Sequence, residues 1–236
     1  MANPIKKQPE KEKDMDVRQA VRERRSIRKF KPDQVPENLV REILDEARWS
    51  PSWGNTQPWE FYVVTGEALK EFKIANCGKL DEGVPSVPDI KMPESWTERL
   101  KKRYSAVGRS TLAALGIARE DTQGRTEQTR TMFRLFDAPC LIAACVDKRS
   151  SSIEYAMLDL GLITQTLCLL AHDRGLGTCI MACAVCFPSA LRNFLPDAEN
   201  KLLAAGIALG YPDRNAPINN FARERAPLEE SVIWVE

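Results

Sequence analysis

Basic side chains crowd one short segment near the start of the chain, where they could bind an anion. Six of the ten residues from Arg22 to Lys31 are basic and one is acidic; the basic ones are Arg22, Arg24, Arg25, Arg28, Lys29 and Lys31. One guanidinium group can donate hydrogen bonds to two phosphate oxygens at once, and the hydroxyl of Ser26 adds a further donor. Arg223 and Arg225 form a second basic pair near the other end. The clusters could form a phosphate site, although spacing alone favours a solvated, basic helix end.

A second candidate is the loop from Pro51 to Pro58, where short polar side chains stand between prolines that stiffen the backbone. Ser52, Asn55 and Gln57 could bind the polar edge of a heteroaromatic ring. The alternative is an ordinary loop whose side chains cap its own backbone. Spacing alone does not separate the two interpretations.

The cysteines and the single histidine limit the other chemistry that the chain can do. Seven cysteines in no repeating framework argue against a secreted disulfide scaffold. Cys183 and Cys186 form one C-x-x-C, but zinc would need two more ligands, so packing is favoured over a redox or metal role. His172 lies near the end of an apolar segment, where a structural role is expected. A mechanism based on histidine would depend on this one residue, unless a cofactor carries the chemistry.

Composition and missing motifs exclude several function classes. Lys and Arg total 34 against 33 Asp and Glu, a net charge of +1, which gives no overall attraction to nucleic acid or to a membrane surface. A non-enzymatic protein that binds nucleic acid through the basic run is therefore disfavoured. The chain also lacks G-x-G-x-x-G, Walker A and G-x-S-x-G sequences.

Hydrophobic periodicity predicts alternating helices and strands that would position these residues. Helices are expected at 17–25, 36–49, 67–76 and 188–194, with a long helix that ends near Arg174, and strands at 61–64, 138–146, 178–182 and 202–209. The long helix ending near Arg174 is apolar on most faces, which predicts a core position. Ser151 and Glu154 predict a capping box before it, and Gly175 its end. The pattern indicates an α+β or three-layer α/β fold.

The ends and the middle of the chain differ from this pattern. Residues 1–14 are charged and predict a disordered tail rather than a signal peptide. The longest helix-like apolar segment, Leu160 to Ala171, is expected to be too short to cross a bilayer, so a cytoplasmic protein is expected. Residues 15–236 are predicted to form one domain. Within it, residues 78–130 form a lid-like insertion, irregular over 78–93 and then helical, with Trp96 and Tyr104 on one face.

Four segments together resemble the FMN-dependent nitroreductase family. They are Arg24–Phe30, Ser50–Trp59, the Gly175–Cys179 turn, and Gly206–Pro212 followed by Arg223–Glu230. The resemblance extends from about Val17 to Trp234 and is weakest in the insertion. The length of the insertion and the Trp53–Trp59 segment are most similar to the nitrobenzoate-reductase-like branch.

The resemblance implies a three-layer α+β fold, with a mostly antiparallel central sheet flanked by helices. It also implies an intertwined homodimer with FMN at the interface. The FMN phosphate and ribityl chain would be held by Arg24, Arg25, Ser26 and Arg28, completed by Arg223 and Arg225. The partner subunit would supply Pro51, Ser52, Trp53, Asn55 and Gln57. Met181 and Ala182 would lie beside flavin N5; many relatives have Glu-Gly or Gly-Gly there, so a backbone N–H is the contact expected.

The activity implied is hydride transfer from NAD(P)H through flavin N5 to a small aromatic acceptor, a nitroaromatic or a quinone, with ping-pong kinetics. Because the cofactor carries the chemistry, neither a catalytic histidine nor a metal is expected. Trp96, Arg99 and Tyr104 in the insertion are candidates for acceptor contacts; the alternative is plain helix packing. Alkene reduction, reductive dehalogenation and flavin cleavage remain alternatives on the same fold.

Overall fold

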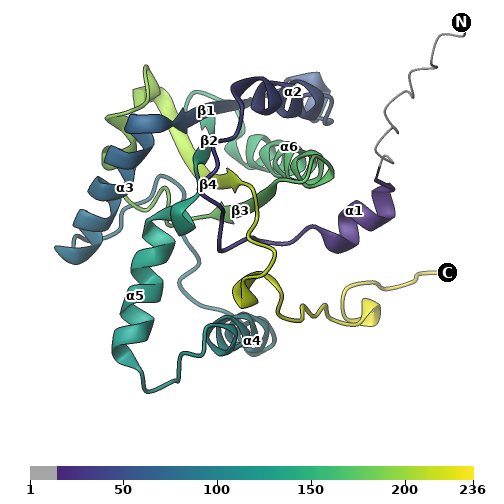
Figure 1. Cartoon of the computed structure of the whole chain (residues 1–236). Helices are drawn as coiled ribbons and strands as arrows, with labels where there is room; N and C mark the ends of the chain where they lie inside the picture. Colours follow the sequence, from purple (N-terminus) through teal and green to yellow (C-terminus); the bar gives the residue numbers. More distant parts are fainter. Residues whose placement is uncertain (1–14) are drawn as a thin grey trace, which may run out of the picture.

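One antiparallel sheet organises the fold in the computed structural model, which describes residues 15–236. The tail expected at 1–14 lies outside the described residues. The strands are β1 (Trp59–Thr65), β2 (Cys140–Asp147), β3 (Gly177–Met181) and β4 (Lys201–Gly210). They pair in the order β1-β2-β4-β3, so β1 and β3 are the edges of the sheet (Figure 1).

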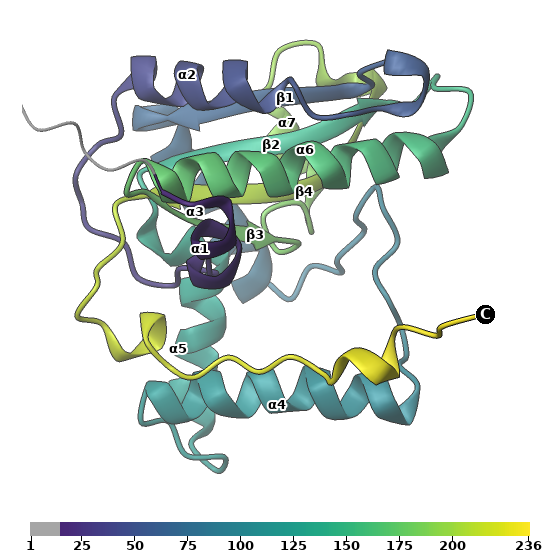
Figure 2. The ribbon, with the colours of Figure 1, turned by 90° about the vertical axis from the view of Figure 1, so that its right-hand side faces the viewer.

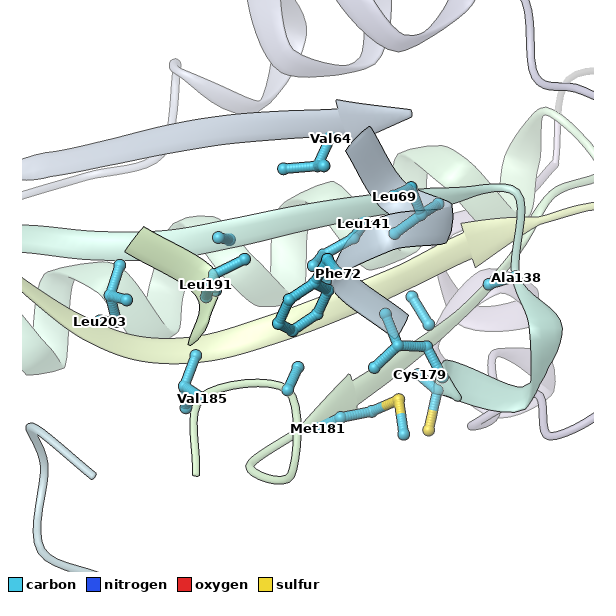
Figure 3. Close-up of a cluster of buried hydrophobic side chains, with 14 of the residues drawn as sticks. Val64, Leu69, Phe72, Ala138, Leu141, Cys179, Met181, Val185, Leu191 and Leu203 are labelled. Carbon is cyan, nitrogen blue, oxygen red and sulfur yellow. The ribbon is translucent and has the colours of Figure 1, made fainter. Parts of the chain in front are cut away.

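The sheet separates two layers of helices, because side chains along β2 alternate between its faces. Leu141 faces an apolar cluster with Phe72 of α3 (Gly66–Asp81) and Leu191 of α7 (Pro188–Arg192), as Figure 3 shows. Ile142 faces the opposite cluster, with Ile43 of α2 (Glu37–Ala47) and Ile163 of α6 (Ile153–Asp173). Figure 1 shows α3 and α6 on opposite sides of the sheet. The predicted three-layer α+β fold with a central antiparallel sheet is confirmed.

Helix α6 is the core helix that its apolar sequence predicts. The hydroxyl of Ser152 accepts a hydrogen bond from the amide of Tyr155 at 3.4 Å, so Ser152 is the N-cap and the prediction of Ser151 was one residue early. Two adjacent serines satisfy the sequence rule equally, and the extended backbone of Ser152 decides between them. Gly175, with φ of 73°, follows the helix end as expected.

The apolar segment from Leu160 to Ala171 belongs to a longer helix, so its own length does not decide whether it could cross a membrane. Helix α6 has 21 residues, and the mean hydropathy of its most apolar window is 1.4, which length and composition would allow in a bilayer. Among the described residues it is the one helix with this property. It packs against α2 and the sheet and buries the carboxylate of Asp159, which marks it as a core helix.

Helix α3 ends later than the predicted residue 76, so the first residues of the predicted insertion are helical. Helix α3 continues through Gly78 to Asp81, because Leu80 still packs against an apolar cluster that contains Phe133 and Phe187. Beyond it, an irregular segment is anchored where Asp89 pairs with Arg192 at 2.5 Å and accepts the amide hydrogen of Leu203 at 2.8 Å.

Two helices follow in the insertion, α4 (Glu98–Ala114) and α5 (Thr122–Phe133). Helix α5 packs along α3, whereas α4 has no buried residue. Figure 2 shows the C-terminal segment running along α4. Trp96 precedes α4 rather than sharing its face, and its ring stacks on that of Tyr104 with centroids 6.0 Å apart.

Candidate cofactor site

The basic segment near the start of the chain is extended backbone rather than helix. Helix α1 (Val17–Glu23) ends two residues before the prediction, and Arg24 leaves it with ψ of 129°. Ser26 then forms a parallel bridge with Thr178, and the amide of Ile27 donates to the carbonyl of Thr178 at 2.9 Å. The segment is therefore fixed along the open edge of β3.

Gly177 allows this close approach of the segment to β3. A Cβ at Gly177 would lie 2.5 Å from Cγ1 of Ile27, a side chain that is itself buried. We expect Gly177→Ala to lower the free energy of unfolding by about 1–3 kcal/mol, because a packed core resists an added methyl group. Urea unfolding measures the change.

Gly78→Ala is the matched control, because a Cβ at this helical glycine meets nothing within 4 Å. It should leave stability unchanged or raise it by up to about 1 kcal/mol. Equal stability of the two variants would show that the contact between Ile27 and Gly177 is not tight.

The C-terminal segment closes on the same place, so the two basic clusters meet as predicted. The guanidinium of Arg223 donates to the carbonyls of Arg22 and Arg24, and that of Arg25 donates to the carbonyl of Phe221. The guanidiniums of Arg25 and Arg28 lie 5.4 and 5.8 Å from the centroid of the Phe221 ring.

Asn219 links the basic segment near the start of the chain to the C-terminal segment, and it was not singled out from the sequence. Its side-chain carbonyl accepts the amide hydrogen of Arg28 at 2.8 Å, and its amide donates to the carbonyls of Lys29 and Asp213 at 2.8 and 2.9 Å. Only 3% of the residue is exposed. No pattern in the sequence marks one asparagine in a coil-like tail, so this role needed the structure.

The meeting point carries positive charge that no ion pair among residues 15–236 neutralises. Burial, then Arg223 and Arg28, lower the pKa of Arg25; burial, then Arg225 and Arg24, lower that of Arg223. Within residues 15–236, no ion pair engages any arginine of the two clusters. Nε of Arg24 and the hydroxyl of Thr178 are buried without a hydrogen-bond partner there. These groups fit a bound anion with several oxygens.

A cavity of about 1100 Å³ opens at this place. The predicted residues that line it are Arg24, Arg25, Ser26, Arg28, Arg99, Arg223 and Arg225. Helix α4 and residues Phe221–Glu230 form the facing walls. Cofactor pockets commonly measure about 300–1,000 Å³, so the space suits a mononucleotide with room for a second ligand.

Comparison with known proteins places the chain. Residues 21–211 match the model of the Nitroreductase family. The chain belongs to the nitroreductase family. A 4-nitrobenzoate reductase of Pseudomonas putida is 33% identical over 210 residues, 89% of this chain and 91% of that protein. A chloronitrobenzene nitroreductase of Comamonas testosteroni is 32% identical over 219 residues, 91% and 95% of the two chains.

Solved nitroreductase structures share the fold. The FMN and NADPH-dependent nitroreductase NfnB of Sphigopyxis sp. strain HMH superposes with a TM-score of 0.89 at 30% identity, covering 94% of this chain and all of that one. The FMN-dependent NfnB of Mycobacterium smegmatis in complex with NADPH gives a TM-score of 0.86 at 30% identity, with the same coverage.

The second nitroreductase motif, the loop from Pro51 to Gln57, is ordered by its own side chains. The hydroxyl of Ser52 accepts the amide hydrogen of Gln57 at 2.9 Å, and the side-chain amide of Gln57 donates to Oδ1 of Asn55 at 3.2 Å. The loop does not line the cavity of its own chain. Its contact with the cofactor of a partner subunit stays a prediction.

Asp159 holds this loop from α6 and was missed in the sequence. Its buried carboxylate accepts the amide hydrogen of Trp53 at 3.1 and 3.2 Å. The residue lies seven positions into an apolar helix, and a lone acid there could have signalled such a role. The arrangement places the ring of Trp53, 65% exposed, on the surface beside Tyr155.

Met181 and Ala182 lie where β3 ends. The side chain of Met181 is buried in the core (Figure 3), whereas Ala182 is exposed. Because the side chain of Met181 packs inward, the backbone is what this nitroreductase strand end can present to a ligand. The predicted N–H contact with flavin N5 stays a prediction.

The predicted acceptor residues separate into two places. Arg99 lines the cavity and donates to the carbonyl of Glu230 at 2.9 Å. Trp96 and Tyr104 stack on each other and are not part of the lining. Lys102, Arg103 and Arg109 of α4 do line the cavity, although they were not singled out, because charges on an exposed helix usually indicate only a solvated face.

The two cysteines of the C-x-x-C pack in the core. Cys183 and Cys186 are free thiols in the apolar cluster around Phe133 and Phe187. Burial raises the pKa of both thiols, which disfavours the reactive thiolate. Among the described residues no group of three acidic, histidine or cysteine side chains could hold a metal. Packing remains the better interpretation.

His172 lies near the arginines and predicts a dependence of stability on pH. Its Nε2 atom is buried with no hydrogen bond to the described residues and lies 3.9 Å from Oε2 of Glu23. Burial lowers the pKa below 6.5; Glu23 opposes this, whereas Arg214, Arg24 and Arg223 add to it. The folded protein therefore resists protonation. The contribution of neutral His172 to the free energy of unfolding is fully present above pH 6.5. It is lost as the pH falls from there toward the folded-state pKa of the residue.

We expect His172→Gln to reduce this loss. The wild-type protein should lose more unfolding free energy than the variant between about pH 7.5 and about pH 5, by at most about 1.4 kcal/mol per pH unit, the limit for one proton. Urea unfolding of both proteins at each pH measures it. A parallel pH dependence of the two would exclude His172 as the cause.

Proposed function

We propose that the chain is an FMN-dependent NAD(P)H oxidoreductase that reduces nitroaromatic compounds. The observation that carries the proposal is the partly buried arginine cluster, which has no ion pair among residues 15–236, at the cavity where the two ends of the domain meet. Membership of the nitroreductase family and the relatives named for nitroarene reduction and for FMN support it.

The chain's own residues would bind and orient the cofactor. Arg24, Arg25 and Arg223, with the hydroxyl of Ser26, would hold the phosphate, whose charge of almost −2 is opposite in sign to theirs. Arg225 would stand near the pyrimidine side of the flavin, where a cation favours the negative charge gained on reduction. Bound FMN would supply the hydride chemistry between the reduced nicotinamide and the acceptor, so these residues would need only to bind and orient it.

We also propose that the protein works as a homodimer. Helix α6 exposes apolar side chains on the side away from the sheet, where Tyr155 and Leu158 are 54% and 59% exposed and Leu162 is 41% exposed. An exposed apolar patch of this kind is typical of an interface. Sedimentation should give a dimer, and Leu158→Asp should shift it to a monomer with weaker FMN binding, because the partner's loop would be lost.

Steady-state kinetics test the proposed reaction. A nitroarene, a quinone and an activated alkene are compared as acceptors at several NADPH concentrations. Nitroarene and quinone turnover with parallel double-reciprocal lines, the pattern of a ping-pong mechanism, is expected. Turnover confined to the alkene would assign a different reaction to the same fold.

We place this protein in the cytoplasm and treat residues 15–236 as one domain. All seven cysteines are free, five of them buried, which suits a reducing compartment. The insertion is tied to the rest of the domain, since its Asp89 pairs with Arg192 at 2.5 Å and accepts the amide hydrogen of Leu203 at 2.8 Å.

A further inference from the structure

Helix α4 concentrates positive charge on the wall of the cavity. It carries five basic residues, Arg99, Lys101, Lys102, Arg103 and Arg109, and one acid, Glu98. Like charges three or four positions apart on a helix destabilise it. The basic residues of α4 do not stabilise the helix itself, so we attribute their position beside the cavity to an anionic ligand.

Neighbouring acids neutralise only part of this charge. Arg103 pairs with Glu230 at 2.5 Å and Lys101 lies 3.7 Å from Glu98. Within residues 15–236, Lys102 and Arg109 have neither an ion pair nor a side-chain hydrogen bond. Both line the cavity, so both are available to a ligand in it.

These two cations stand at the rim of the cavity. Together with Arg99 they border both the main cavity and a second hollow of about 520 Å³ against α4. The opposite wall already holds Arg24, Arg25 and Arg223, whose combined charge exceeds that of one phosphate. Nine basic side chains and two acids, Glu224 and Glu230, line the cavity, so one bound phosphate leaves positive charge that a second anion can balance.

We propose that Lys102 and Arg109 bind the 2′-phosphate of NADPH and so make the protein prefer NADPH to NADH. The inference rests on the proposed function and deepens it. A reductant whose nicotinamide reaches the flavin would extend its adenosine end away from it. A basic side chain is the usual partner of a 2′-phosphate. An acceptor carboxylate fits less well, because the acceptor ring would lie near the end of β3, and Met181 does not line this cavity.

The test compares NADPH with NADH in the FMN-loaded enzyme. We expect the ratio of kcat/KM for NADPH to that for NADH to fall roughly tenfold in the double variant Lys102→Gln, Arg109→Gln, which corresponds to about 1.4 kcal/mol. Raising the ionic strength should lower the same ratio in the wild-type enzyme. Arg119→Gln is the control, because Arg119 is exposed just beyond α4 and lines neither hollow, and it should keep the wild-type ratio.

Other outcomes overturn the inference. An unchanged ratio in the double variant would do so, and so would a wild-type enzyme that prefers NADH. A loss limited to 4-nitrobenzoate, with nitrobenzene unaffected and the ratio unchanged, would assign the rim to an acceptor carboxylate. Failure of the proposed function is distinct: a wild-type protein that takes up no FMN has no turnover with either reductant.

Discussion

Replacing Arg25 with glutamine should weaken FMN binding by roughly 1.5–3 kcal/mol, or about 10- to 150-fold, because hydrogen bonds to charged groups are worth this much when solvent is excluded. Arg25 is half-buried, and this burial, followed by its neighbours Arg223 and Arg28, lowers its pKa, so a bound phosphate would favour its charged form. Titration of apoprotein with FMN, followed by flavin fluorescence, measures the change.

Lys31→Gln is the control for this variant. Lys31 belongs to the same basic run, but it is exposed and does not line the cavity. It should change FMN affinity by no more than a few tenths of a kcal/mol, as expected for a distant surface charge. Equal weakening by both variants would mean that the run acts through its overall charge rather than through a phosphate site.

Asn219→Ala should lower the free energy of unfolding by about 2–4 kcal/mol, because it leaves buried backbone groups of Arg28 and Asp213 without their partner. FMN affinity should fall as well. Asn219 holds the extended segment with Arg24 and Arg25 in place beside the C-terminal segment with Arg223, and the variant weakens this link. Urea unfolding and FMN titration of the same preparation give both numbers.

The next residue supplies a matched control. The side chain of Asn220 also donates to two carbonyls, those of Arg214 and Ala216 at 2.7 and 3.0 Å, but the residue is exposed. Its alanine variant should cost about 0.5 kcal/mol, as surface substitutions do, and should leave FMN affinity unchanged. If both alanine variants were equally stable, Asn219 would not be the link between the two segments.

Local patterns were enough to predict most elements of the fold. The unbroken apolar run of β2 and the spacing of Val40, Ile43 and Ala47 in α2 are both buried as expected. Boundaries were less predictable: α1 ends early because Arg24 and Arg25 turn to follow β3, and α3 ends late because Leu80 still finds an apolar partner. Tertiary packing decides such ends, and a local pattern does not contain it.

The sequence indicated the arginines of the candidate site but not the buried residues that hold its segments in place. Both arginine clusters follow family motifs, and their meeting is confirmed across about two hundred positions by the bonds from Arg223 to the carbonyls of Arg22 and Arg24. Asn219 and Asp159 carry no such motif, because each acts through one contact distant in sequence. Lys102 and Arg109 of α4 were missed for another reason. A basic helix that faces a cavity has the same composition as one that faces only solvent.

The most direct test of the central claim is to compare FMN with riboflavin, which lacks the phosphate, as ligands of the apoprotein. If the arginine cavity is the phosphate site, FMN should bind at least about a hundredfold more tightly, which corresponds to about 2.7 kcal/mol. The difference should shrink in Arg25→Gln and persist in Lys31→Gln. Equal affinity for the two flavins, or no binding of either, would contradict the account.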